Sequence, residues 1–239
     1  MNRKMSLGMA AGGLLGFTAA AYPALWRDRC LNWGARADEV ARTMPGDKLL
    51  PDAPVVSTRA ITIPAPASAI WPWLVQMGPG RGGAYTYDWI ENLFGLDMHS
   101  ANEIIPELQR LEVGDEIPLG AKLRMCVEVL EPEYAMVMRS DDGAWVWSFG
   151  LYPDVPSAPG GGPTRLVSRN RIQSPRRGLM SSALSLYVME PGSLIMERRM
   201  LLGIKERASL TAKLSYAASP DRALGHHACP IPEFPLPRS

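Results

Sequence analysis

The chain carries almost no net charge and few cysteines. Its formal charge at neutral pH is +1 over 239 residues, so no overall field attracts it to nucleic acid, and we predict no nucleic-acid partner. The three cysteines, Cys30, Cys126 and Cys229, are odd in number and widely spaced, which argues against a disulfide framework. Hydrophobic residues make up 46% of the chain and charged residues 21%, a balance typical of a globular protein with a well-developed core.

Several catalytic and cofactor signatures are also missing. The sequence shows no Ser-His-Asp order, no paired carboxylates within one motif and no P-loop. His226, His227 and Cys229 come closest to a metal motif, but they offer only three ligands, in a segment that we expect to be disordered. We therefore predict no metal and no cofactor, and the sequence names no catalytic residue.

A long uncharged run follows Arg3 and Lys4 at the start of the chain. It extends from Met5 to Trp26, and a helix that spans a bilayer needs roughly 20 residues. As a secretory signal, the run would be cleaved after its small residues and the protein would be secreted. We favour residues 1–26 as a single retained membrane helix, and the side of the membrane stays open. Its close-packing face, which also suits a homodimer, would consist of Gly8, Gly12 and Gly16.

The remaining chain divides into three parts. Residues 27–56 are short on periodicity and are predicted to be a connector with a short helix near residues 38–42. Residues 57–217 carry the regular periodicity and are predicted to be one folded domain. Residues 218–239 are proline-rich and aperiodic, and we expect them to be disordered.

The folded domain starts with a β-branched, alternating run at residues 58–63. Helical periodicity follows over residues 70–77, with Ser68 as the expected cap, and again over residues 87–93 and 100–111. The period then changes to two, with short turns between the runs, which is typical of an antiparallel sheet with one buried face. These alternating runs cover residues 113–119, 123–129, 134–138, 145–151 and 166–170.

One long helix is expected at the end of the domain, from about Ser193 to Leu214, with a break near Pro191 and Gly192. It is the segment whose length suits it to cover the apolar face of a curved sheet. We therefore predict an α+β helix-grip fold. In this fold a curved antiparallel β-sheet is wrapped around a long C-terminal α-helix, with small helices after the first strand and a cavity between helix and sheet.

The stretch GPGRGG, residues 78–83, matches the G-x-G-x-x-G pattern of dinucleotide-binding loops. Such a site needs a strand directly before the loop and a parallel βαβ unit after it. Here a predicted helix precedes the loop, and the downstream turns are too short for parallel crossovers. The glycines therefore predict a tight helix-to-helix connection that needs positive φ angles. Arg81 lies among them with little side-chain bulk beside it.

Residues 58–119 resemble a known group of proteins, and so do the later stretches WVWSFGLYP, TRLVSRNR and MERRMLLGIKERA. The group is the SRPBCC superfamily (START-like, polyketide cyclase/dehydrase-like), in a bacterial branch with an N-terminal hydrophobic segment. The resemblance covers about residues 32–210 and implies a helix-grip fold with a deep apolar cavity. It implies no single activity, because the superfamily includes lipid carriers, metabolite-binding proteins, aromatic cyclases and oxygenase subunits.

The residues around the glycine loop are candidates for the rim of that cavity. The alternative is that Asp88 only starts a helix, that Tyr85 and Tyr87 only pack in the wall, and that His99 is a cap or a surface group. Glu197 falls inside the apolar face of the long helix, where a carboxylate must reach water, pair with a neighbour such as Arg198, or face a wet cavity. The predicted ligand-binding residues are Arg81, Tyr85, Tyr87, Asp88, Trp89, His99, Trp147 and Glu197.

Three arginines alternate along the last predicted strand: Arg165, Arg169 and Arg171. A period of two places all three on the same face of the sheet. We expect that face to be the solvated outer face. Contact with anionic lipid head groups is the alternative if the domain lies at a membrane.

Three functions remain open, of which the last is a structural or assembly role with dimerisation through the helix of Gly8, Gly12 and Gly16. The first is a membrane-tethered module that binds a hydrophobic small molecule, lipid-like or aromatic, in the cavity. The alternative is an enzyme of the cyclase or hydratase type, with acid–base groups at the cavity mouth. That enzyme requires at least two of its candidate side chains to point inward, within reach of one bound molecule: Tyr85, Tyr87, Asp88 and His99.

Overall fold

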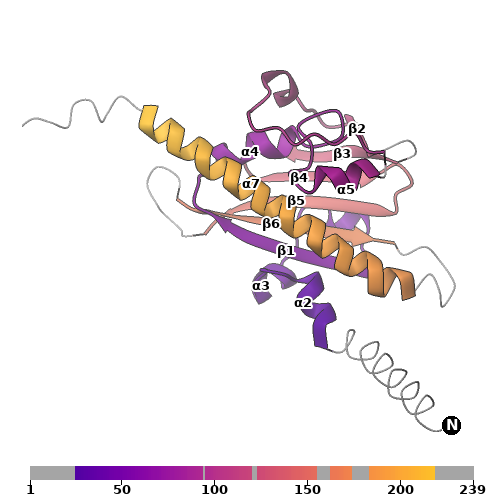
Figure 1. Cartoon of the computed structure of the whole chain (residues 1–239). Coiled ribbons are helices and arrows are strands. Elements are labelled where there is room, and N and C mark those ends of the chain that lie inside the picture. Colours follow the sequence, from indigo (N-terminus) through magenta and orange to yellow (C-terminus); the bar gives the residue numbers. More distant parts are fainter. Residues whose placement is uncertain (1–24, 94, 120–122, 155–161, 174–182, 219–239) are drawn as a thin grey trace, which may run out of the picture.

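The computed structural model describes residues 25–93, 95–119, 123–154, 162–173 and 183–218 (Figure 1). Most of the predicted N-terminal membrane segment, residues 1–26, and nearly all of the predicted tail, residues 218–239, lie outside the described residues. Within the described ranges, no helix combines the length and the apolar character needed to cross a bilayer.

Six strands form one antiparallel sheet: β1 (Val55–Ile63), β2 (Glu116–Pro118), β3 (Arg124–Glu131), β4 (Ala135–Ser140), β5 (Trp145–Pro153) and β6 (Thr164–Ile172). Their order in the sheet is β1-β6-β5-β4-β3-β2. Strands β2 to β6 therefore form a meander, and β1 closes it by pairing along its whole length with β6. Each predicted alternating run overlaps one of these strands. β1 begins at Val55, two residues earlier than the predicted start of the domain.

The C-terminal helix α7 (Glu190–Ala218) crosses one face of the sheet diagonally (Figure 1). The predicted break near Pro191 is wrong. A π-helical turn, η4 (Ser185–Met189), runs directly into α7, and the backbone N–H of Glu190 donates to the carbonyl of Ser185. This wider turn relieves the clash that a proline ring makes with the carbonyl four residues earlier, so the helix continues past Pro191. Sheet and helix together give the α+β helix-grip architecture predicted from the sequence.

Three short helices lie between the first two strands: α4 (Ala67–Val75), α5 (Asp88–Leu93) and η3 (Pro106–Gln109). α4 buries one apolar face, as predicted, but its N-cap is Pro66 rather than the predicted Ser68. The longer helix predicted over residues 100–111 is replaced by η3 alone. Pro106 explains this, because it disfavours the helical conformation at the residue before it, which is extended here.

The main hydrophobic core lies between the sheet and the helices α4 and α7. Burial of a large apolar side chain contributes about 1.5–3 kcal/mol, so this layer fixes α7 on the sheet. The part of the core nearest the meander is rich in methionine. Fully buried members of the core include Ile63, Ile70, Phe149, Leu166, Leu201 and Ile204.

The segment predicted to be a connector is in fact packed against the sheet and against α7. It forms α2 (Arg27–Leu31), α3 (Ala37–Ala41) and η2 (Asp47–Leu49). Residues 32–53 are called the outer layer here. Met44 of this layer packs against Ala60 and Val167, on the face of the sheet that does not contact α7. The sheet is therefore covered on both faces in this region, and not on one face as the alternating pattern predicted.

The predicted solvated face of Arg165, Arg169 and Arg171 is wrong for the same reason. Intervening residues of β6 face Glu197 of α7, so the arginines point to the opposite side, into the outer layer. Arg165 is 7% exposed and Arg169 is 3% exposed. The charges that compensate these arginines lie more than 100 residues earlier in the chain, where an alternating pattern gives no indication of them.

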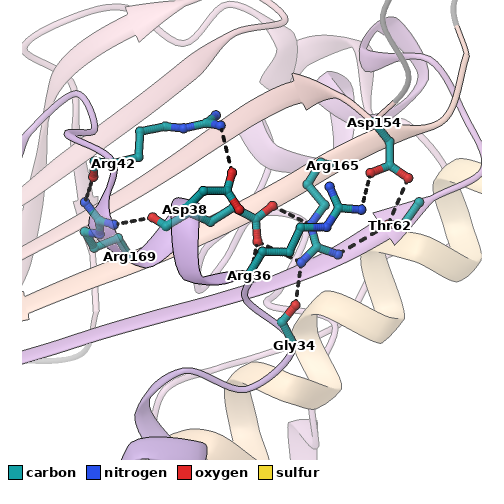
Figure 2. Close-up of polar contacts among 9 residues, drawn as sticks. Gly34, Arg36, Asp38, Arg42, Thr62, Asp154, Arg165 and Arg169 are labelled. Atoms are coloured by element: carbon teal, nitrogen blue, oxygen red, sulfur yellow. Dashed lines mark hydrogen bonds and ion pairs between the residues drawn. The ribbon is translucent and has the colours of Figure 1, made fainter.

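The buried arginines bind the outer layer through its backbone and its carboxylates (Figure 2). Arg165 forms an ion pair with Glu39 at 2.6 Å. Arg169 donates to the backbone carbonyls of Glu39, Val40 and Arg42, which close the C-terminal end of α3. Burial alone would raise the pKa of Glu39, but the hydrogen bonds from Arg165 and from the backbone outweigh it and hold that pKa below its ordinary value.

Candidate functional site

An apolar cavity of about 270 Å³ lies under the meander, beside the glycine loop. Four methionines from separate parts of the chain line it: Met77, Met98, Met125 and Met138. Methionine is unbranched and polarizable, so walls of this kind adapt to the shape of an apolar ligand. This cavity is called the methionine lobe here.

A second cavity, of about 440 Å³, adjoins the first toward the N-terminal part of α7. It is bounded by Met189, Met196 and Met200 on the helix side and is called the helix lobe here. Because several residues line both cavities, the two are lobes of one site. The shared residues are Ala84, Glu91, Leu123, Trp145 and Trp147.

Two stacked tryptophans form the wall that both lobes share. The rings of Trp145 and Trp147 lie 5.4 Å apart at an angle of 20°, and Phe149 packs 4.9 Å beyond Trp147. The indole N–H of Trp145 donates to Asn170 at 2.8 Å, and that of Trp147 donates to Ser168 at 2.9 Å. Both polar atoms are thus satisfied, and the tryptophans offer the cavity flat apolar surfaces.

Glu197 places a carboxylate at the edge of the helix lobe. It forms an ion pair with Arg59 and accepts hydrogen bonds from Ser168 at 2.6 Å and from Asn170 at 3.1 Å. Burial raises the pKa of the Glu197 carboxyl, and the guanidinium of Arg59 opposes that rise. The pairing considered from the sequence, with a neighbour such as Arg198, is not the one formed. The partner comes from β1.

Arg59 was missed as a candidate although it is fully buried. Its guanidinium bonds Glu197 and also donates to the carbonyl of Cys30 at 3.1 Å and to Ser193 at 3.0 Å. The pattern of β1 did carry a signal. Arg59 shares the inward face with Ile61 and Ile63 by the period of two, and a charge in such a row requires a buried partner.

The glycine loop connects α4 to α5, as predicted. Gly78, Gly80 and Gly83 have φ angles of 128°, 65° and 71°, which L side chains rarely adopt. The N–H of Gly78 donates to the carbonyl of Gly83 at 3.0 Å and the reverse bond measures 3.1 Å, so the loop is a closed turn. At Gly82 the requirement is space, because an added Cβ would lie 2.8 Å from the side chain of Gln76.

Arg81 and Tyr85 turn into the protein and line neither lobe. A guanidinium nitrogen of Arg81 donates to the carbonyls of Val75 at 3.0 Å and Leu108 at 3.4 Å, and burial lowers the pKa of Arg81. Tyr85 is 1% exposed, and its hydroxyl donates to the carbonyl of Trp73 at 2.9 Å. Burial raises the pKa of Tyr85. Both residues hold the loop against the fold.

The other candidates near the loop lie on or near the surface. Tyr87 and Trp89 are exposed, and His99 is 78% exposed beside Asp97. The carboxylate of Asp88 accepts hydrogen bonds from the backbone N–H and the hydroxyl of Ser100, at 2.8 and 2.6 Å, which orders the segment after α5. The predicted residues that line the cavity are Trp147 and Glu197.

No family model matches the chain, and no curated protein matches it. Solved structures do match. A polyketide cyclase-like protein from Corynebacterium glutamicum is 16% identical over 73% of this chain and 97% of its own, with a TM-score of 0.31. CalU16 from Micromonospora echinospora is 12% identical over 67% and 88%, with a TM-score of 0.29. A norcoclaurine synthase point mutant from Thalictrum flavum is 12% identical over 69% and 96%, with a TM-score of 0.34.

These identities are low and the TM-scores lie between 0.29 and 0.34, so the matches support no inference about this chain. The ligand and the chemistry of this chain have to be inferred from its own side chains.

Proposed function

We propose that this protein binds a hydrophobic small molecule, lipid-like or aromatic, in the cavity between α7 and the sheet. The observation that carries the proposal is the pair of adjoining lobes, of about 270 and 440 Å³, with walls of methionine, leucine and tryptophan. Ligand sites commonly have volumes of about 300–1,000 Å³, apolar walls and a few well-placed polar groups. Taken together as one site, the two lobes have these properties.

The ion pair of Glu197 and Arg59 supplies a polar edge to the helix lobe. The two charges compensate each other, and the hydroxyl of Ser168 and the amide of Asn170 complete the hydrogen bonds of the carboxylate. A satisfied pair of this kind orients a polar group of a ligand.

The cyclase or hydratase alternative required two of four acid–base candidates to point into the cavity. Tyr85 lies in the core with its hydroxyl already bonded, and Asp88 is bonded within its own segment. Tyr87 and His99 are exposed. None of the four lines either lobe, so we favour binding over turnover by these groups.

Filling the junction of the two lobes is expected to weaken ligand binding. Ala84 is buried and lines both lobes, so a phenylalanine at this position would occupy the space between them. We expect Ala84→Phe to lower the affinity for the apolar fluorescent probe N-phenyl-1-naphthylamine by about tenfold or more, that is, by at least about 1.4 kcal/mol. Titration of probe fluorescence measures the change.

The matched control is Ala37→Phe, which adds the same side chain at an exposed position of α3. It should leave probe affinity unchanged. Thermal unfolding of all variants separates a filled cavity from a damaged fold, and Met138→Phe provides a second filling variant from the sheet side. Unchanged binding by two folded filling variants would contradict the proposal, and so would failure of the unaltered protein to bind the probe.

Attachment to a membrane through residues 1–26 remains part of the proposal, as does the homodimer through the same segment. Leu25 and Trp26 are exposed, and Arg27 pairs with Glu190, so the segment joins the fold beside Met189 of the helix lobe. In a flotation assay, we expect the whole chain to float with liposomes. A chain that begins at residue 27 should remain in the fraction without liposomes. Equal flotation of both chains, or of neither, would contradict the tether.

A further inference from the structure

Glu91 holds a carboxylate at the junction of the two lobes, which both include it in their walls. It lies in α5, the short helix that follows the glycine loop and Thr86 along the chain. The next residue, Asn92, fixes the end of that short helix. Its side chain bonds the backbone N–H of Met98 at 2.6 Å and the carbonyl of Met98 at 2.9 Å. The position of Glu91 is therefore set by the fold rather than by a ligand.

One oxygen of the Glu91 carboxylate, Oε2, forms no hydrogen bond in the part of the chain that the structure describes. This Oε2 and the hydroxyl oxygen of Thr86 are shielded from solvent, and neither meets the geometry of a hydrogen bond there, although the Thr86 hydroxyl lies close enough to the carboxyl to affect its pKa. The carboxylates of two buried residues are treated differently, because Glu39 faces Arg165 and Glu197 faces Arg59. A buried polar group without a partner costs free energy, and such groups are rare in native proteins unless they serve a purpose.

Among the described residues, none adds a positive charge that lowers the pKa of Glu91. Burial raises the pKa of its carboxyl, the nearby Asp88 raises it further, and the Thr86 hydroxyl opposes the rise. The adjoining wall consists of Trp145 and Trp147, whose N–H groups are already bonded elsewhere. The described walls of the cavity thus leave the carboxylate to be compensated by a bound molecule.

We propose that Glu91 and Thr86 recognise a hydrogen-bond donor on the ligand, an amine or a hydroxyl group carried by a flat apolar body. The inference rests on the proposed function, because it concerns the same cavity. The apolar body would lie against the tryptophan wall while its donor reaches Glu91. A ligand that brings a carboxylate or a phosphate to this point is disfavoured by repulsion.

Four small probes with one ring system test this ligand class: naphthalene, 2-naphthol, 2-naphthylmethylamine and 2-naphthoate. Their binding is followed through the fluorescence of the cavity tryptophans. We expect the amine and the naphthol to bind about tenfold or more tighter than naphthalene, since a hydrogen bond to a charged group contributes about that factor, and 2-naphthoate to bind more weakly. If the amine binds more tightly than the naphthol, the natural ligand is a cation. If the naphthol binds more tightly, the ligand is a neutral hydroxyl compound. Both orders support the proposal.

The variant Glu91→Gln keeps the shape of the side chain and removes its charge. We expect it to lower the affinity for the amine about tenfold or more, to reduce the advantage of the naphthol over naphthalene, and to leave naphthalene binding unchanged. The matched control is Glu107→Gln at an exposed position of η3, which should change none of the four affinities.

The outcomes separate this inference from the proposed function. If none of the four probes binds, naphthalene included, the proposed function fails. Two results would overturn the role of Glu91 and still support binding in the cavity. In the first, naphthalene binds but the donor probes bind no better. In the second, 2-naphthoate binds as well as the amine. A Glu91→Gln variant that loses naphthalene together with the amine would show that Glu91 acts through the fold and would overturn the inference as well.

Discussion

Replacing Glu197 with leucine is expected to lower the free energy of unfolding by about 3–5 kcal/mol, because the change leaves Arg59 buried without its carboxylate. Arg59 cannot escape the cost by losing its proton, since a guanidinium stays charged in proteins. Its remaining bonds go to a backbone carbonyl and to the hydroxyl of Ser193, which carry no charge. Urea unfolding monitored by tryptophan fluorescence measures the loss.

The double variant Arg59→Met/Glu197→Leu provides the control. Replacing both partners of a buried pair by apolar side chains of similar size is often close to neutral, so most of the lost stability should return. If the double variant is as unstable as Glu197→Leu alone, the cost does not arise from an uncompensated charge. The helix lobe of a stable double variant also lacks its polar edge, so it tests whether the pair orients the ligand.

A second large effect is expected from Arg169→Lys, although the substitution preserves the charge. The guanidinium of Arg169 bonds three backbone carbonyls of the outer layer, the carboxylate of Asp47 at 2.8 Å and the hydroxyl of Thr58 at 3.0 Å. A lysine ammonium is a compact donor and cannot reach this spread of acceptors. We expect a loss of about 2–4 kcal/mol, since each buried acceptor left without a donor costs about 1–3 kcal/mol.

The same variant should expose the outer layer to proteolysis. Limited digestion is expected to cut within residues 32–53 of Arg169→Lys before it cuts elsewhere in the folded part, because the carbonyls that close α3 lose their donor. Arg110→Lys, at an exposed position after η3, is the matched control and should change neither stability nor digestion. Equal stability of the two variants would show that the hydrogen bonds of the Arg169 guanidinium contribute little to the free energy of unfolding.

The fold was predictable from the sequence because its main signals are local. The alternation from β3 to β6 indicates neighbouring antiparallel strands, and the length of α7 suits it to cover their sheet, and that was enough to assign the helix-grip. Pro191 was misjudged because a single proline normally ends a helix, whereas the π-helical turn before it accommodates the ring. The outer layer was missed because its apolar side chains are few and it is held largely by polar contacts.

The site was predictable only in part, for a related reason. Trp147 and Glu197 could be found because each stands out on the buried face of its own element. Arg59 pairs with a residue 138 positions away, and such a distance gives no local pattern. Glu91 was missed because nothing on its short helix distinguishes a carboxylate that faces a cavity from one that faces water. Arg81 drew attention because of its glycine neighbours, yet its guanidinium bonds two backbone carbonyls.

The pairing of the outer layer with β6 also has a consequence for the order of events during synthesis. Glu39 leaves the ribosome 126 residues before its partner Arg165, and the carbonyl of Glu39 precedes Arg169 by 130 residues. At about 5–20 residues per second, that interval lasts roughly 6–26 seconds. During that interval the Glu39 carboxylate and the carbonyls at the end of α3 lack the arginines of β6 that bond them in the folded protein. Residues 32–53 can therefore take up their final contacts only after β6 has been made.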